Sequence, residues 1–373
     1  MHSTPSQRFT ALDVFRGITI CFMIIVNTSG NYETTWSPLL HAKWNGFTPT
    51  DLVFPSFLFA VGNAMSFVMK KWSSLSQQQV LFKILKRTAI IFLLGYLMYW
   101  FPFFKMDEAG RIIPFPISET RILGVLQRIA LCYGIASLLI YFLKEKIALL
   151  VTCMALLAYW VLLFAFGDSG NELSLTGNAV LRLDTWLMGE KHLYHGEGIG
   201  FDPEGWLSTL PAVANVVAGF VVGNYVQQKG KTFEGLTKIM FIGFALLVIS
   251  YFWNLVFPVN KKLWTSSFVT LTIGLDCIMI SAVIYWIEFN NRKSLFFEVF
   301  GKNPLIIYLL SELLAIVFEI IHVGQESLHE WLFTHVFSLA GNYLGSFLYA
   351  VAYMLMCWCA GYWMNKKKIY VKV

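Results

Sequence analysis

Charged residues are scarce in this chain of 373 residues. Asp, Glu, Lys and Arg together make up 13% of it, whereas soluble domains carry roughly 25%. Apolar residues reach 57% and aromatic residues 17%, and runs of about 20 apolar residues recur along the chain, which is typical of a polytopic membrane protein. The composition therefore argues against a soluble domain. It also means that the net charge of +6 does not indicate nucleic-acid binding.

Cysteine is also rare. All six cysteines fall inside predicted helices, so no disulfide framework is expected across the loops. The Cys357–Trp358–Cys359 sequence lacks the spacing of a metal-ligand pair, and no metal is expected. Because internal repeats and low-complexity tracts are missing too, we expect one integral domain, residues 1–373.

Ten apolar stretches predict an all-α membrane bundle. They are about residues 12–30, 51–69, 88–104, 122–143, 147–166, 208–226, 237–257, 265–288, 303–320 and 336–363. With both termini in the cytoplasm, 19 of the 28 Lys and Arg residues lie on inner segments, from Arg8 to Lys372, and 8 on outer segments. That asymmetry predicts this orientation. The long outer loops are then about 31–50, 105–120 and 167–207.

The first outer loop is dense in polar side chains. His41 can shuttle a proton near neutral pH or act as a nucleophile. Trp44 has the flat surface to stack on a sugar ring, and Asn45 can hydrogen-bond to a sugar. The alternative is a structural histidine, satisfied by backbone carbonyls in an ordered loop.

Two further residues flank this loop. Asn27 ends the first helix, where its amide is either a C-cap or a catalytic group that donates to an oxyanion or orients His41. Asp51 begins the second helix, where an acidic side chain favours the helix dipole. Helix capping is the favoured role of Asp51, with substrate binding as the alternative.

Several basic residues near or within the bilayer are candidates for holding an anionic group. Arg128 lies inside a predicted helix, and an intramembrane arginine must face a cavity or a partner. Lys302 and Asn303 precede Pro304 at the start of another helix, which favours phosphate binding, although proline is also common there. Arg16, three residues after Asp13, forms either an ion pair or part of the same site.

The third outer loop contains His192 and His195, followed by Glu197. Two histidines and a carboxylate can bind zinc, but the intervening glycines and the absence of a firm helix argue against it. Acidic residues also gather in this loop, Asp202 and Glu204 among them.

Several motifs, in one order along the whole chain, closely resemble the transmembrane heparan-α-glucosaminide N-acetyltransferase family. These motifs are LDVFRG (12–17), VN (26–27), HAKWNG (41–46), TDLVFP (50–55), GVLQR (124–128), KHLY (191–194), FDPEG (201–205) and NKKLW (260–264). They add His192, Asp202, Glu204 and Trp264 to Trp44, Asn45 and Asp51 as substrate-binding candidates.

The resemblance implies an all-helical membrane enzyme, a homodimer, that transfers an acetyl group from cytoplasmic acetyl-CoA to a glucosamine amine across the membrane. It implies that His41 is catalytic and that Asn27 assists it. We place the nucleotide end of acetyl-CoA near Arg16, Arg128, Lys302 and Asn303. Lys43 within HAKWNG and Ser311 before Glu312 depart from the family pattern. The chain also lacks the lumenal amino-terminal domain of lysosomal members, so we expect a bacterial inner-membrane enzyme whose acceptor differs from heparan sulfate.

Two catalytic routes fit these residues: direct transfer with His41 as general base, which we favour, and a relay through acetyl-histidine. Two other functions remain as alternatives. One is O-acylation of a surface glycan, and the other is sugar transport.

Overall fold

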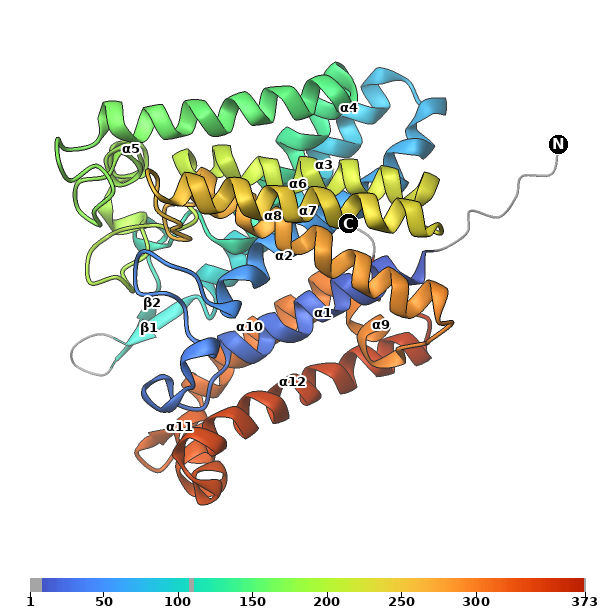
Figure 1. Ribbon diagram of the computed structural model, residues 1–373. Helices are drawn as coiled ribbons and strands as arrows, with labels where there is room; N and C mark the ends of the chain where they lie inside the picture. The colour runs from blue at the N-terminus through green and yellow to red at the C-terminus, as the bar shows by residue number, and fades with distance from the viewer. Residues whose placement is uncertain (1–8, 107–110, 372–373) are drawn as a thin grey trace.

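The computed structural model describes residues 9–106 and 111–371. Arg8, Lys372 and residues 107–110 of the second expected outer loop lie outside the described residues. Figure 1 shows an α-helical bundle whose long helices lie side by side. The helices are α1 Thr10–Asn27, α2 Pro49–Met69, α3 Gln77–Trp100, α4 Val125–Phe166, α5 Ala179–Met188, α6 Trp206–Lys229, α7 Phe233–Asn254, α8 Ser266–Ile284, α9 Leu295–Lys302, α10 Pro304–Ile320, α11 Leu328–Leu332 and α12 Asn342–Lys366.

The predicted all-α membrane architecture is confirmed. Each of the ten predicted stretches is helical, and α4 accounts for two of them because Lys144, at φ 62°, breaks it into two limbs. Within the described ranges, seven helices are long and apolar enough to cross a membrane, or eight if the bent pair α9–α10 counts as one span. Helix α3 ends at Trp100, a few residues before its predicted end at 104.

Two small antiparallel hairpins were not predicted. Strand β1 (Phe104–Met106) pairs with β2 (Ile112–Pro114), and β3 (His322–Val323) pairs with β4 (Glu326–Ser327). Figure 1 places β1–β2, α5 and α11 at one end of the bundle and α9 at the opposite end. We call the first the loop end and the second the basic end, because Lys83, Arg87 and Lys302 lie there.

Helix α2 crosses the bundle from the loop end to the basic end and packs closely against α6. A Cβ atom on Gly62 would lie 1.9 Å from the backbone oxygen of Val216, and one on Gly219 would lie 2.0 Å from that of Phe59. Only glycine allows helices to approach this closely, as in other membrane bundles. The contact holds α2 rigidly, and α2 begins beside His41.

Candidate active site

His41 lies at the loop end, in the segment that joins α1 to α2. Its Nδ1 atom is 2.7 Å from Oδ1 of Asp51, while 43% of its side chain is exposed. Asp51 is fully buried, and its second carboxylate oxygen accepts hydrogen bonds from the backbone N–H groups of Ala42 (3.1 Å) and Thr48 (2.9 Å). The ring is therefore oriented by a buried carboxylate, and part of it remains exposed to solvent.

The helix-capping role predicted for Asp51 is confirmed. Thr48 and Asp51 form a capping box at the start of α2, which satisfies backbone donors that the first helical turn leaves free. The Thr48 hydroxyl also donates to the backbone oxygen of Leu40 at 2.7 Å. The same carboxylate thus fixes the helix start and the histidine. Asp51 lies behind His41, and its oxygens are occupied by these partners.

Lys261 is the second partner of His41. Its Nζ atom lies 3.0 Å from Nδ1 and 3.1 Å from Nε2 of the ring, and 3.9 Å from Oδ1 of Asp51. The loop between α7 and α8 positions it, because the Asn260 side chain accepts from the Leu263 backbone N–H (2.8 Å) and donates to Asn45 (3.1 Å). A residue 220 positions away in sequence therefore completes the site.

Two effects lower the pKa of His41 below its ordinary value: desolvation of the ring, which is the larger, and the Lys261 ammonium group. The hydrogen bond to Asp51 opposes them without outweighing them. A lowered pKa keeps the imidazole neutral near pH 7, which is the form that acts as a base. Desolvation likewise lowers the pKa of Lys261, against the opposing charges of Asp51 and Glu204.

A buried ion cluster supports the site from the third outer loop. Arg121 binds Asp202 at 2.7 and 2.9 Å and Glu204 at 2.7 Å, and its guanidinium lies between the rings of Tyr99 and Tyr194. Burial raises the pKa of Glu204, but Arg121 and the other nearby cations outweigh it, so the net pKa is lowered. Asp202 and Glu204, expected to bind substrate, are thus both buried beside Arg121.

The other candidate residues at the loop end differ in their exposure and in their hydrogen-bond partners. Asn27 is exposed, and its amide donates to Glu312 of α10 at 3.4 Å. Trp44 is half-buried, and its indole N–H donates to the Leu173 backbone oxygen at 2.8 Å. Asn45 is exposed beside Asn260, and His192 contacts the Thr120 backbone oxygen at 2.7 Å. Asp51 therefore orients His41, whereas Asn27 pairs with Glu312.

Trp264 and Arg128 lie together in the interior. Trp264 is fully buried, and its indole N–H donates to Asn215 at 3.2 Å. The Arg128 guanidinium lies over the Trp264 ring at 4.9 Å and donates to the Gly205 backbone oxygen (3.1 Å) and to Ser208. Both residues pack beneath the third outer loop, so their observed contacts are with the protein.

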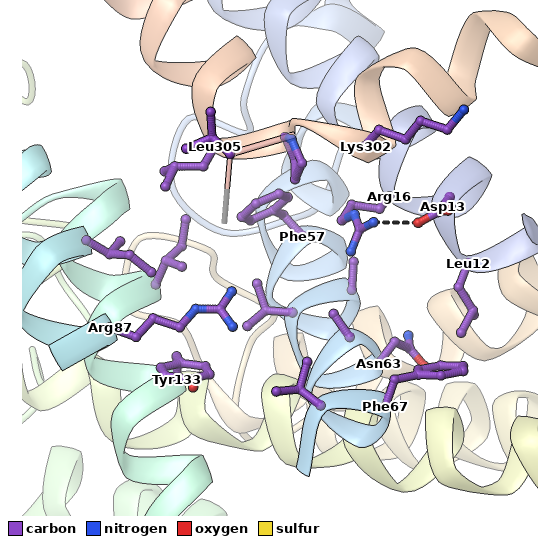
Figure 2. Close-up of a pocket in the computed structure, with 18 of the residues that line it drawn as sticks. Leu12, Asp13, Arg16, Phe57, Asn63, Phe67, Arg87, Tyr133, Lys302 and Leu305 are labelled. Carbon is purple, nitrogen blue, oxygen red and sulfur yellow. Dashed lines mark hydrogen bonds and ion pairs between the residues drawn. The ribbon is translucent and has the colours of Figure 1, made fainter. Parts of the chain in front are cut away.

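A cavity of about 1050 Å³ opens at the basic end. Figure 2 shows Arg16, Lys302 and Leu305 along one side and Arg87 and Tyr133 along the other. Its cationic lining residues are Arg16, Lys71, Lys83, Lys86, Arg87 and Lys302. Asp13 pairs with Arg16 at 2.6 Å and Glu298 with Lys302 at 3.2 Å, which leaves an excess of positive charge that favours an anionic ligand.

Buried polar groups in the cavity wall lack partners within the described part of the chain. The side-chain oxygen of Asn63 and the Nε of Arg87 are buried and make no hydrogen bond. Asn63 as a whole is only 2% exposed. Unpaired buried polar groups are costly and rare. They fit a ligand with its own hydrogen-bonding groups inside the cavity.

The cavity stops short of His41. On α2, Phe57 is the lining residue nearest in sequence to Asp51, and six positions of helix span about 9 Å. Of the four predicted anion-binding residues, Arg16 and Lys302 line the cavity, and Arg128 lies beside Trp264. Asn303 is buried and bonds residues 369 and 371.

Lys261, Arg121, Arg87 and Asn63 were not predicted as functional residues from the sequence. Lys261 lies in the NKKLW motif, three residues before Trp264, and Arg87 is one of the basic residues whose distribution predicts the orientation. No local sequence pattern pairs two loops about 200 residues apart, so the partners of His41 beyond its own loop do not follow from the sequence.

Comparison with known proteins places the chain among relatives. The family described as "Heparan-alpha-glucosaminide N-acetyltransferase, catalytic" matches residues 8–251, a range that includes His41 and Asp51 but ends before Lys261. A mouse (Mus musculus) protein named heparan-alpha-glucosaminide N-acetyltransferase is 26% identical over 369 residues, covering 83% of this chain and 54% of the relative. The human (Homo sapiens) protein of that name is 27% identical over 338 residues, covering 76% and 49%.

The chain thus spans about half the length of the curated relatives it matches. The family match alone covers more than half of the chain and includes the loop that holds His41. This chain therefore belongs to the heparan-alpha-glucosaminide N-acetyltransferase catalytic family.

Proposed function

We propose that this protein is a transmembrane acetyltransferase. It takes the acetyl group of acetyl-CoA, bound in the cavity at the basic end, and transfers it to the amine of a glucosamine-type sugar at the loop end. The observation that carries the proposal is the pairing of two sites in one bundle. An exposed histidine backed by a buried carboxylate lies at one end, and a cation-lined cavity lies at the other.

The contacts of His41 support a general-base role. With Nδ1 bonded to Asp51, Nε2 is the atom that takes a proton from the acceptor, and the Asp51 carboxylate stabilises the imidazolium that forms. The Nζ of Lys261 lies 3.1 Å from Nε2, so the acceptor must displace it from this position. The relatives, both named as N-acetyltransferases, support an amine as the acceptor.

The proposed step is direct transfer. The acceptor amine loses a proton to Nε2 of His41 and attacks the thioester carbonyl. The C–S bond then breaks, and the leaving sulfur takes the proton from the His41 imidazolium, so that CoA leaves as its thiol and the ring is neutral again. An Asn27 amide near the reacting carbon would stabilise the oxyanion. About 9 Å of α2 separates Phe57 from the level of Asp51, so the acyl end of the donor must extend beyond the cavity toward His41.

The cavity suits the donor chemically. Coenzyme A carries phosphate groups that match Arg16, Arg87 and Lys302, because arginine and lysine bind phosphate by charge-assisted hydrogen bonds. Its pantetheine arm carries amides that match the unpaired oxygen of Asn63. We place the basic end in the cytoplasm, where positive loops concentrate, and His41 on the outer side.

Purified protein in detergent, given acetyl-CoA and glucosamine, tests the proposal. We expect free thiol to be released only when the amine is present, together with N-acetylglucosamine. The matched comparison is glucose, which offers hydroxyls and no amine. Thiol release with glucose as well would indicate an O-acyltransferase, and no release with either sugar would contradict the proposal.

A further inference from the structure

The chain turns back on itself after α12. The backbone N–H of Ile369 donates to the oxygen of Met364 at 2.9 Å, and Lys368 adopts the left-handed φ of 57°. The Tyr370 hydroxyl then donates to the side-chain oxygen of Asn365 at 3.1 Å. Residues 369–371, here called the return segment, are therefore tied to the helix that precedes them.

Asn303 binds the return segment from a distant part of the sequence. Its Nδ2 donates to the backbone oxygen of Ile369 at 2.9 Å, and its Oδ1 accepts from the backbone N–H of Val371 at 3.0 Å. These two bonds flank Tyr370 as a neighbouring β-strand would. Asn303 is only 1% exposed, whereas Ile369 and Val371 are exposed, so the two bonds join a buried side chain to a segment at the surface.

The position of Asn303 explains why it is available for this contact. It separates α9 from α10, which meet at an angle of 85°. Pro304 begins α10 and has no backbone N–H to continue the helix. At such a break the side chain points away from the regular helix packing and is free to pair with another segment.

The return segment forms part of the cavity at the basic end. Tyr370 and Val371 line it, as do Lys302, Pro304 and Leu305 on either side of Asn303. The Lys302 ammonium donates to Asn365 at 3.3 Å, and Asn365 also accepts from Tyr370. The position of the return segment is thus linked to that of a cation in the cavity wall.

We propose that the return segment is a wall of the coenzyme A site and that Asn303 is the residue that positions it. The inference rests on the proposed function for the identity of the ligand. It assigns Asn303 an indirect role: the amide holds the wall and does not bind the phosphates itself. Loss of either the amide or the segment opens the cavity on one side, next to Lys302, whose contacts with Asn365 and Glu298 remain.

Titration of detergent-purified protein with CoA itself tests this without catalysis. Four proteins are compared: the unaltered chain, Asn303→Ala, a chain ending at Lys368, and the combination of both changes. Asn303→Ala removes the two hydrogen bonds that hold the segment, and the shortened chain removes the segment itself with its lining residues Tyr370 and Val371. We expect each change to raise the Kd for CoA roughly tenfold or more. The combination should raise the Kd no further than the shortening alone.

If Asn303→Ala raised the Kd for CoA by the same factor in the full chain and in the shortened chain, the inference would be overturned, because Asn303 would then act on CoA directly. An unchanged Kd in the shortened chain would also overturn it. If Asn303→Ala does not fold, Asn303→Asp keeps the acceptor for Val371 and loses only the donor to Ile369, and it should show a smaller rise that also disappears in the shortened chain. The KM for glucosamine should not change in any variant.

The two proposals fail separately. An unaltered protein that binds CoA but transfers no acetyl group contradicts the proposed function, while the Kd series still decides the role of the return segment. An unaltered protein that does not bind CoA contradicts both.

Discussion

The carboxylate of Asp51 lies 2.7 Å from Nδ1 of His41, ten residues earlier in the chain, and is fully buried. The same carboxylate accepts the backbone N–H of Thr48, the N-cap residue of α2. One buried side chain therefore fixes both a helix start and the orientation of the exposed ring. The proposed role of His41 as a general base depends on Asp51 being held in place at the helix start while it orients the ring.

Asp51→Asn should separate these two roles. The amide keeps the size of the side chain but cannot stabilise an imidazolium, so we expect kcat to fall by about 10²–10⁴-fold with little change in the Kd for CoA. The matched control is Thr48→Ala, which weakens the cap by about 1 kcal/mol and leaves the His41 contact in place. Similar kcat losses in both variants would show that Asp51 acts only through folding.

Lys261→Met should change the pH dependence of transfer. Removing the ammonium group removes one of the effects that lower the pKa of His41, so that pKa rises. Because only the neutral ring acts as a base, the acid limb of kcat/KM should move to higher pH. Lys262→Met is the control, since Lys262 bonds Glu197 and the Lys43 backbone oxygen. A limb that stays in place or moves to lower pH would refute the role of Lys261.

The general architecture could be predicted from the sequence, because apolar runs of membrane length depend only on local composition. Even the break of α4 near Lys144 follows from the sequence, because two separate apolar stretches end and begin there. The orienting role of Asp51 was harder to foresee, since capping alone explains an acid at a helix start. The contact of Lys261 with His41 depends on how two loops 220 positions apart pack together, and no local pattern encodes that.

The residues that line the cavity could not be predicted from the sequence for the same reason. Its lining comes from α1, α2, the turn Lys70–Ser74, α3, α4, α9, α10 and the return segment, so which residues line it depends on how these segments pack together. The rule that an intramembrane arginine faces a cavity or a partner holds for Arg128, whose partners are Trp264, Gly205 and Ser208. Sequence alone could not distinguish such a partner from a ligand.

Neutralising a cavity cation should weaken donor binding. We expect Lys302→Met and Arg87→Met each to raise the Kd for CoA roughly tenfold, because each loses a charge-assisted contact with phosphate, and to reduce the effect of added salt on binding. Lys293→Met removes the same charge from an exposed position at the same end and serves as the control. Calorimetric titration at two salt concentrations measures both effects, and an equal weakening by Lys293→Met would mean that the contacts are not specific.

Arg128→Met should affect stability more than donor binding. The change removes the contact of the guanidinium with the Trp264 ring and its hydrogen bonds to Gly205 and Ser208, which costs about 2 kcal/mol, so the thermal midpoint in detergent should fall. The folded fraction should bind CoA with unchanged affinity. A large rise in Kd at an unchanged thermal midpoint would place Arg128 in the donor site after all.

His41→Ala tests the central claim most directly, with free thiol and N-acetylglucosamine both measured after mixing with acetyl-CoA and glucosamine. We predict that glucosamine-dependent thiol release falls to the background rate while the Kd for CoA stays unchanged. Turnover retained within about tenfold of the unaltered protein would contradict the assignment of His41 as the catalytic base.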